Sequence, residues 1–342
     1  MNEQTLKATA AALTADGKGL LAMDESNPTA DKRFAALGIP QTAEMRRAYR
    51  DMIVTAPGLS ESIGGAILYD ETIRTRTFAD LPFAQALDKA GIVPGIKVDA
   101  GARPLALHDG ELVTEGLEGL RERLAEYSTM GARFAKWRAV ITIDDARNTP
   151  SRGCYQANAE ALARYAALCQ EAGIVPIVEP EVLMDGAHTL ARCAEVTEHA
   201  LHVVFEALRA QRVLLEGMIL KPNMVVPGLK CPVQDSVDEV ADATVRVFRR
   251  SVPAAVGGIA FLSGGQSAAD ASARLNAMHV RHGAGLPWPL AFSFARAIQD
   301  PAMKAWAGKT ENVPAAQKAL VERARLNRLA REGRYTAAME RS

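Results

Sequence analysis

One lysine, Lys221, stands where a strand-like run of the sequence ends. Apolar residues dominate the run from Leu214 to Leu220, and Pro222 follows the lysine at once. Proline cannot donate a hydrogen bond to a neighbouring strand, so the predicted strand ends at this lysine. Burial there would disfavour the charged ammonium, and a free amine can attack a carbonyl to form a Schiff base. The alternative is a lysine whose stem covers apolar surface while its head reaches water.

Charged side chains also recur toward the ends of other strand-like runs. Side chains alternate along a strand, so two residues at spacing two point to one face. A buried strand does not turn charges inward unless they find partners. The recurring residues are Asp24 and Glu25, Lys97 and Asp99, Lys136 and Arg138, and Glu179 and Glu181. We expect one polar site that gathers cations and carboxylates around Lys221.

Two later stretches predict a site for an anion. Ser263, Gly264 and Gly265 follow a strand-like run, and glycines let backbone N–H groups converge on a phosphate at the start of the next helix. Ser293 and Arg296 add a hydroxyl and a guanidinium after the last run. Two adjacent glycines alone are more typical of a turn.

A second anion site is predicted across the same pocket. Its candidates are Lys97 and Arg138, together with Ser26, Thr29, Lys32 and Arg33. Two phosphate sites around one lysine would suit a bisphosphorylated sugar. A metal site is not predicted, because the paired histidines (His199 with His202, His279 with His282) do not lie at strand ends.

Eight short strand-like runs alternate with helical patterns along the chain, which indicates an α/β fold with a parallel sheet. They are Gly19 to Glu25, Ile63 to Asp70, Val93 to Asp99, Arg133 to Ile141, Ile174 to Val182, Leu214 to Lys221, Gly258 to Gly265 and Leu290 to Ala295. Eight such units predict a (β/α)8 TIM barrel, whose sites lie at the carboxyl ends of the strands. An open doubly wound sheet is the alternative, but no GxGxxG follows the first run.

The helical patterns include an extra helix before the first strand and two segments after the last. All the helical patterns, in chain order, are Glu3 to Ala15, Thr42 to Thr55, Leu117 to Met130, Gln156 to Ala172, His188 to Ala210, Val237 to Val252, Pro301 to Trp306 and Pro314 to Arg331. No composition break or linker divides the chain, so we expect one domain over residues 1–342.

The amino-acid composition limits the classes of partner that the protein is expected to bind. The 40 basic and 40 acidic residues cancel, so neither nucleic acid nor an anionic membrane is an expected partner. No run reaches the roughly 18 apolar residues of a membrane span. The first residues lack the pattern of a signal or transit peptide, so we expect a cytoplasmic protein. The four cysteines show no metal-binding spacing, and we expect them to be reduced.

Seven motifs follow one another along the chain: GLLAMDES, GIKVDAG, FAKWRAV, PIVEPEV, LKPNMV, FLSGGQS and FSFARA. Together and in this order they resemble class I fructose-bisphosphate aldolase. The resemblance runs from about Lys18 to Tyr335. It implies a TIM barrel, usually a homotetramer, that cleaves fructose 1,6-bisphosphate reversibly into dihydroxyacetone phosphate and glyceraldehyde 3-phosphate. It implies no cofactor and no catalytic metal.

The resemblance also implies roles for individual residues. Lys221 would form the Schiff base, Glu179 would be the general acid and base, and Lys136 the neighbouring cation. Asp24 would assist cleavage of the carbon–carbon bond, although either Asp24 or Glu179 could be its base. One phosphate site would use Ser263, Gly264, Gly265, Ser293 and Arg296, and the other Ser26, Thr29, Arg33, Lys97 and Arg138.

Three features depart from the family. Phe294 and Ala295 stand where many relatives have tyrosine and glycine, and Ala100 where many have lysine. The sequence also ends soon after Tyr335, without the longer tail that carries a terminal tyrosine, so we expect another group or water to protonate the carbanion. Two other functions remain open: a Schiff-base aldolase for another phosphosugar such as sedoheptulose bisphosphate, and a catalytically silent scaffold.

Overall fold

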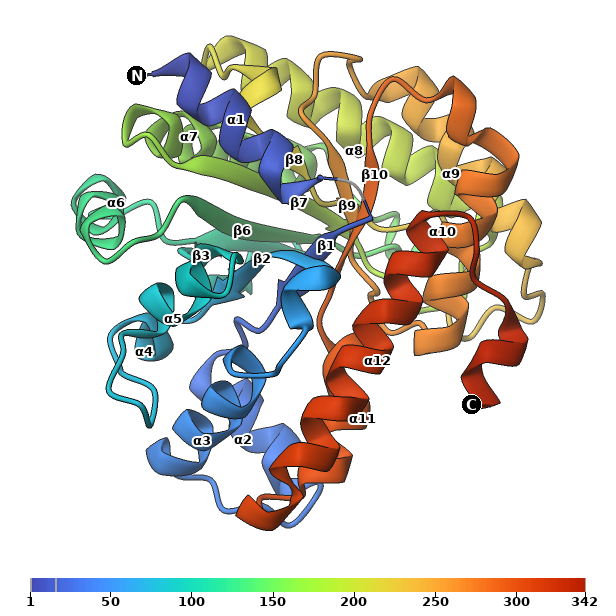
Figure 1. The fold of residues 1–342 in the computed structure, drawn as a ribbon. Coiled ribbons are helices and arrows are strands. Elements are labelled where there is room, and N and C mark those ends of the chain that lie inside the picture. The colour runs from blue at the N-terminus through green and yellow to red at the C-terminus, as the bar shows by residue number, and fades with distance from the viewer. Residues whose placement is uncertain (1, 16, 342) are drawn as a thin grey trace.

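Eight parallel strands close into a barrel in the computed structural model, which describes residues 2–15 and 17–341 (Figure 1). The barrel strands are β1 (Gly19–Ala22), β2 (Ile63–Leu68), β3 (Val93–Lys97), β6 (Phe134–Ile141), β7 (Val175–Val182), β8 (Ile219–Leu220), β9 (Ile259–Phe261) and β10 (Leu290–Phe294). Their order is β1-β10-β9-β8-β7-β6-β3-β2, and β2 pairs with β1 to close the ring. The predicted TIM barrel is confirmed.

Helices surround the ring of strands (Figure 1). They are α1 (Glu3–Leu13), α2 (Asn27–Ala35), α3 (Ala43–Val54), α4 (Asp70–Ile73), α5 (Phe83–Lys89), α6 (Leu120–Thr129), α7 (Arg152–Glu171), α8 (Leu190–Ala210), α9 (Val237–Ser251), α10 (Ala268–His282), α11 (Arg296–Trp306) and α12 (Val313–Arg331). The helix that was predicted to begin at Pro301 begins more than one turn earlier, at Arg296, so this predicted boundary was wrong. The helix begins directly after β10, and Pro301 lies inside it.

The prediction of a strand from Leu214 was wrong over its first half. Leu215–Gly217 form a short 3-10 helix, and only Ile219 and Leu220 pair as strand β8. Gly217 lies so close to α1 that an added Cβ would be 2.9 Å from the Cβ of Leu6. Packing beneath α1 therefore accounts for this apolar stretch. A hairpin of β4 (Gly101–Pro104) and β5 (Leu112–Glu115) after β3 was not predicted.

The inside of the barrel has an apolar layer at the amino ends of the strands. Leu20, Phe134, Ile177 and Ile219 belong to one buried cluster with residues of α1. The three buried residues of α1 recur at helical spacing and place one face of that helix against the barrel. They are Leu6, Ala10 and Leu13. Helix α1 thus closes this end of the barrel (Figure 1).

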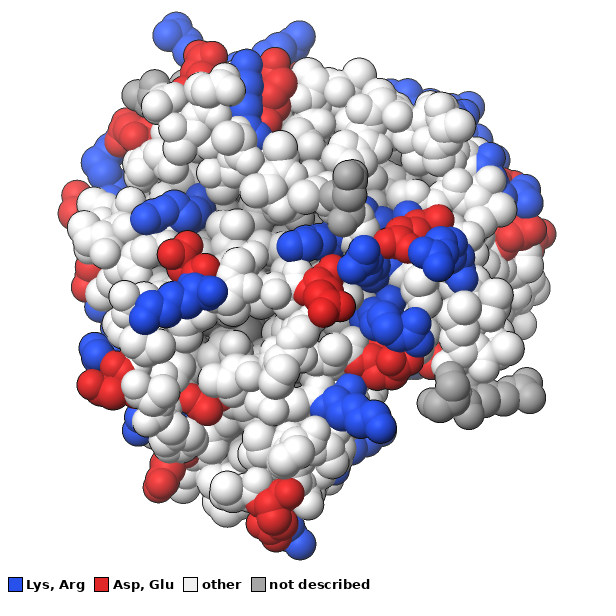
Figure 2. Space-filling model, in the orientation of Figure 1, with Lys and Arg blue, Asp and Glu red and all other residues white. Residues whose placement is uncertain are grey.

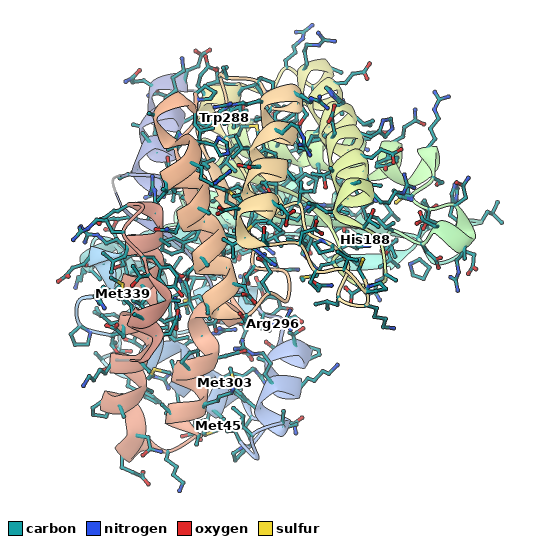
Figure 3. The ribbon with its side chains drawn as sticks, turned by 90° about the vertical axis from the view of Figure 1, so that its right-hand side faces the viewer. Met45, His188, Trp288, Arg296, Met303 and Met339 are labelled. Carbon is teal, nitrogen blue, oxygen red and sulfur yellow. The ribbon has the colours of Figure 1, made fainter. Side chains whose placement is uncertain are left out.

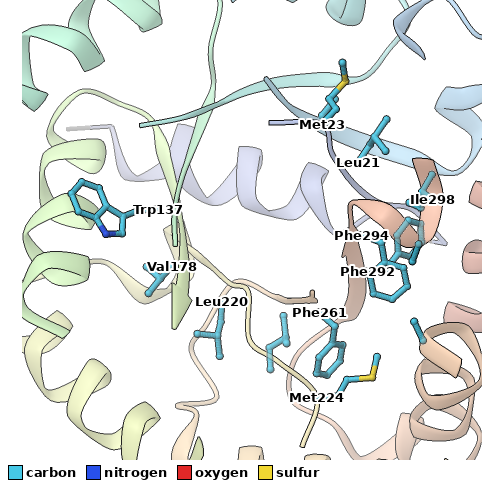
Figure 4. Close-up of a cluster of buried hydrophobic side chains, with 14 of the residues drawn as sticks. Leu21, Met23, Trp137, Val178, Leu220, Met224, Phe261, Phe292, Phe294 and Ile298 are labelled. Atoms are coloured by element: carbon cyan, nitrogen blue, oxygen red, sulfur yellow. The ribbon is translucent and has the colours of Figure 1, made fainter. Parts of the chain in front are cut away.

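The outward side chains of the strands form the larger core against the helices. Trp137, Val178 and Leu220 belong to this second cluster and point away from the barrel axis (Figure 4). Because side chains alternate along a strand, the residues next to them in sequence turn inward. The next inward positions are Lys136, Glu179 and Lys221, so alternation places three charged groups inside the barrel.

The surface carries both signs of charge. In Figure 2, Lys and Arg side chains lie beside Asp and Glu over much of the face shown, as the equal numbers of the two kinds would predict. Among the described residues, no helix has the length and apolar character needed to cross a membrane.

The last described segment is tied to the side of the barrel. Arg323 of α12 is buried, and its guanidinium donates to both carboxylate oxygens of Glu340 at 2.7 Å. The Tyr335 hydroxyl donates to the same carboxylate at 2.7 Å, and Arg323 also donates to Ser272 of α10 at 2.7 Å. Ser342 lies outside the described residues. These contacts give the short tail a structural role.

We predict that Gly95→Ala destabilises the fold. Gly95 faces the barrel interior, and an added Cβ would lie 2.2 Å from the Phe134 ring. Such overpacking costs about 1–3 kcal/mol of unfolding free energy. Gly283→Ala is the control, because its Cβ would find its nearest neighbour at 3.9 Å in a helical conformation. Equilibrium urea unfolding would measure both, and equal stability of the two variants would contradict this packing.

Candidate active site

A cavity of about 650 Å³ opens at the carboxyl ends of the barrel strands. It brings together thirteen of the fourteen residues that the family resemblance implies for the site, and it is also lined by Glu25, Lys32 and Glu181, which were predicted from the strand ends and the second anion site, and by Asp185, which was not predicted. Those thirteen are Asp24, Ser26, Thr29, Arg33, Lys97, Lys136, Arg138, Glu179, Lys221, Ser263, Gly264, Ser293 and Arg296. Gly265 lines a neighbouring hollow that shares Ser263 and Arg296.

Four buried charged side chains form a row in this cavity. The Lys221 Nζ lies 3.0 Å from Oε1 of Glu179, and the other oxygen of that carboxylate lies 3.4 Å from the Lys136 Nζ. Lys136 in turn lies 2.7 Å from Asp24. All four are at most 8% exposed. The row therefore alternates cation and anion, and each carboxylate faces at least one ammonium without water between them.

This row shifts the pKa of its carboxyl groups. Burial would raise the pKa of Asp24, but the ammonium groups of Lys136 and Lys221 outweigh burial and lower it to about 2. Burial likewise opposes the two lysines at Glu179, whose pKa is lowered. Burial would lower the pKa of Lys136, yet Asp24 and Glu179 raise it. Lys136 is thus a permanent cation, and both carboxyl groups are ionised at neutral pH.

The backbone fixes the position of Lys221. Its N–H donates to the carbonyl of Val178 at 2.8 Å, one residue before Glu179. On its other side, the N–H of Leu262 donates to the carbonyl of Pro222 at 3.1 Å. The lysine therefore lies between strand β7, which carries Glu179, and the loop after β9, which begins at Leu262 and continues with Ser263.

The loop after β9 has the shape of an anion cradle. Gly264 and Gly265 have φ values of +62° and +117°, which side-chain-bearing residues rarely adopt. The Ser293 hydroxyl is buried in the cavity and has no hydrogen-bond partner among the described residues. Arg296 is exposed at the start of α11, and the described residues offer it no ion-pair partner. Arg296 follows strand β10 and Trp288 precedes it, and Figure 3 shows these two residues far apart.

The other side of the cavity is more fully paired. Lys97 lies 2.5 Å from Asp99, and Arg138 donates to Glu181. The hydroxyl groups of Ser26 and Thr29 lie 3.0 Å apart at the start of α2. This side has the hydroxyls and cations that a phosphate needs, but Lys97, Arg138 and Arg33 are already bound to carboxylates.

The side-chain contacts that hold Arg33 in place were not predicted from the sequence. Its guanidinium contacts Glu25 and donates to Asp300 of α11 at 2.9 Å. Arg50 of α3 reaches the other oxygen of Glu25 at 2.8 Å. Gln299, beside Asp300, donates to the carbonyl of Ala22 at 2.6 Å. One signal for this network was available: in the predicted helix Thr42 to Thr55, Arg50 stands three and four residues before the apolar Ile53 and Val54 and is therefore their neighbour.

Metal ligands do not cluster in the described part of the chain. No group there of three or more His, Cys, Asp and Glu side chains could hold a metal ion. Of the predicted histidines, His282 binds Asp242 at 2.7 Å, and a ring nitrogen of His279 lies 3.1 Å from the carbonyl of Leu290.

Known proteins match this chain over nearly its whole length. The family model described as fructose-bisphosphate aldolase class-I (glycolytic) matches residues 5–342. A probable fructose-bisphosphate aldolase class 1 from Xanthomonas axonopodis pv. citri is 54% identical over 98% of this chain and 99% of its own. Cytoplasmic isozyme 2 of fructose-bisphosphate aldolase from Pisum sativum is 48% identical over 97% of this chain and 92% of its own.

A solved structure agrees in three dimensions. It is a fructose-bisphosphate aldolase from Plasmodium falciparum in complex with TRAP and a small-molecule inhibitor. The two folds share a TM-score of 0.96 and 45% sequence identity, over 98% of this chain and 96% of the other. Family model, relatives and fold agree with the motifs and with the barrel: this chain belongs to the class I fructose-bisphosphate aldolases.

Proposed function

We propose that Lys221 cleaves fructose 1,6-bisphosphate through a Schiff base, with Glu179, Lys136 and Asp24 as its partners. The observation that carries the proposal is the row of four buried charges, in which Lys221 lies 3.0 Å from Glu179. An amine and a proton acceptor within hydrogen-bond reach, inside a cavity large enough for a sugar, are what imine formation needs.

Imine formation requires two protons to leave the Lys221 ammonium and depart with the substrate oxygen as water. Glu179 is placed to accept the first proton, which leaves a neutral amine to attack the ketose carbonyl. The attacking nitrogen passes its second proton to the carbonyl oxygen. Glu179 then returns its proton to that hydroxyl, water leaves, and the nitrogen becomes a protonated imine.

The state of Glu179 changes during this exchange. In the free enzyme two lysines lower its pKa, so it holds a proton poorly. Once Lys221 becomes neutral, one of those cations is lost and the pKa of Glu179 rises. Lys136 remains charged and keeps the carboxyl oriented at 3.4 Å. The same carboxyl can therefore act first as a base and then as an acid.

Carbon–carbon cleavage follows from the protonated imine, which accepts the electron pair of the breaking bond. A base must remove the proton of the substrate hydroxyl beside that bond. Asp24 and Glu179 both flank Lys136, so either carboxylate can take this proton. Reprotonation of the carbanion and hydrolysis of the imine then release dihydroxyacetone phosphate and regenerate Lys221.

The two phosphates have different positions in this proposal. The phosphate next to the carbonyl must lie close to Lys221, and the loop of Ser263, Gly264 and Gly265 follows the strand next to β8. We place that phosphate there, with Ser293 and Arg296. The remote phosphate extends to the opposite group, Ser26, Thr29, Arg33, Lys97 and Arg138.

The proposal extends to the subunit count of the protein and its location in the cell. We infer a homotetramer from the family resemblance, and light scattering of the purified protein would measure the subunit count. We infer a cytoplasmic location, as the name of the Pisum sativum relative states for that protein.

We predict that Lys221→Arg abolishes cleavage while leaving the fold intact. Arginine keeps a cation beside Glu179, but its guanidinium stays protonated and cannot form an imine. Loss of a covalent nucleophile should lower turnover by more than about 10³-fold. Coupled assays of triose phosphate release, with circular dichroism as the folding control, would test this. Turnover close to wild type would exclude Lys221 as the nucleophile.

We predict that Lys136→Met reverses the effect of acid on stability. In wild type the carboxyl of Asp24 has a pKa lowered to about 2, so its stabilising effect is complete above its unfolded pKa near 4 and is lost as pH falls toward 2. Without Lys136, burial dominates and raises the pKa of Asp24. The unfolding free energy of the variant should then increase as pH falls from 7 to 5.

Urea unfolding between pH 4 and pH 8 would measure both proteins. The control is Lys7→Met, which removes a surface lysine of α1 and should keep the wild-type profile. Parallel profiles for wild type and Lys136→Met would show that Lys136 does not set the charge state of Asp24.

A further inference from the structure

Arg33 is shared between two carboxylates that differ in their surroundings. Its Nη1 contacts Glu25 in the loop after strand β1, and its Nη2 donates to Asp300 of α11 at 2.9 Å. Nη1 also lies 3.4 Å from the side-chain oxygen of Gln299. The guanidinium thus connects helix α2 to helix α11 at the rim of the cavity.

Glu25 cannot release Arg33 at low cost. Its side chain is 10% exposed, and its other oxygen is bound by Arg50, which is 4% exposed. Separating a buried carboxylate from one of two guanidinium partners leaves a charge away from water. Glu25 and Arg50 therefore form the fixed part of this network.

Asp300 can release Arg33 much more easily. Its side chain is 46% exposed, and among the described residues Arg33 is its one ion-pair partner. Water can replace the guanidinium at such a carboxylate, and partly exposed ion pairs contribute little to stability. Of the two contacts, the one to Asp300 is the one that a ligand can displace.

Arg33 and Asp300 line different hollows, which adjoin each other at Ser263 and Arg296. Arg33 lines the substrate cavity, whereas Asp300 lines the neighbouring hollow with Gly265 and Lys304. A phosphate in the cavity can therefore reach the guanidinium of Arg33. Nη2 carries two N–H groups and Nε carries one, so a phosphate that binds through Nη2 shares this nitrogen with Asp300 and competes with that carboxylate for the charge of Arg33.

We propose that Asp300 is a specificity-determining residue, an internal counter-ion that competes with the remote phosphate of the sugar for Arg33. Asp300 weakens binding of that phosphate and thereby sets how strongly the enzyme prefers a bisphosphate to a ketose 1-phosphate. The inference rests on the proposed function, since it assigns Arg33 to the remote phosphate.

The test compares fructose 1,6-bisphosphate with fructose 1-phosphate, which lacks the remote phosphate. Asp300→Ala should lower the KM of the bisphosphate about two- to fivefold, the range expected for a partly exposed ion pair, with little change in kcat. The KM of fructose 1-phosphate should stay within error. Arg296→Ala, on the shared phosphate, should instead raise the KM of both substrates.

A double-mutant cycle separates this effect from a general change in charge. In an Arg33→Met background, Asp300→Ala should no longer alter the KM of the bisphosphate. Asp270→Asn removes a carboxylate that accepts a hydrogen bond from the Ser267 hydroxyl at the start of α10 and does not contact Arg33, so it should leave the ratio of the two KM values unchanged.

Three results would overturn the inference: an unchanged or higher bisphosphate KM in Asp300→Ala, equal changes for both substrates, or an effect that persists without Arg33. Failure of the proposed function would look different, because wild type would then release triose phosphate from neither substrate and would form no imine.

Discussion

The site depends on one constraint, the mutual neutralisation of four buried charges. They belong to Lys221, Glu179, Lys136 and Asp24. Two ammonium groups and two carboxylates are buried in one row with contacts of 3.0, 3.4 and 2.7 Å. Removing one partner from such a group strands a charge away from water and costs about 3–5 kcal/mol. The row also allows a proton to move between neighbours without any net charge entering or leaving the cavity.

The barrel provides this row through layering. Inward positions along β6 run from Phe134 to Lys136 and Arg138, so one strand passes from the apolar layer into the charged layer. Strand β7 does the same from Ile177 to Glu179. Helix α1 and the apolar layer close the amino end, and water and substrate reach the charges from the carboxyl end alone. A single alternation of side chains thus determines both the core and the chemistry.

That alternation is also why much of the site could be predicted. Lys136, Glu179 and Lys221 face inward because of a period of two residues, which is a local property of the sequence. The apolar run from Leu214 was misassigned because a short apolar segment fits a strand or a helical turn equally well. The partners of Arg33 could not be predicted: Gln299 and Asp300 lie 266 and 267 residues away, and their contacts depend on how α2 docks against α11.

The central claim is that Lys221 carries the covalent intermediate, and that Lys97 and Lys136, which also line the cavity, do not. Sodium borohydride reduces a protonated imine to a stable secondary amine, so treatment in the presence of dihydroxyacetone phosphate should fix the substrate to its lysine. Peptide mass mapping should then find the added mass on the peptide that contains Lys221, with Lys97 and Lys136 unmodified. The added mass on Lys97 or Lys136, with Lys221 unmodified, would contradict the account.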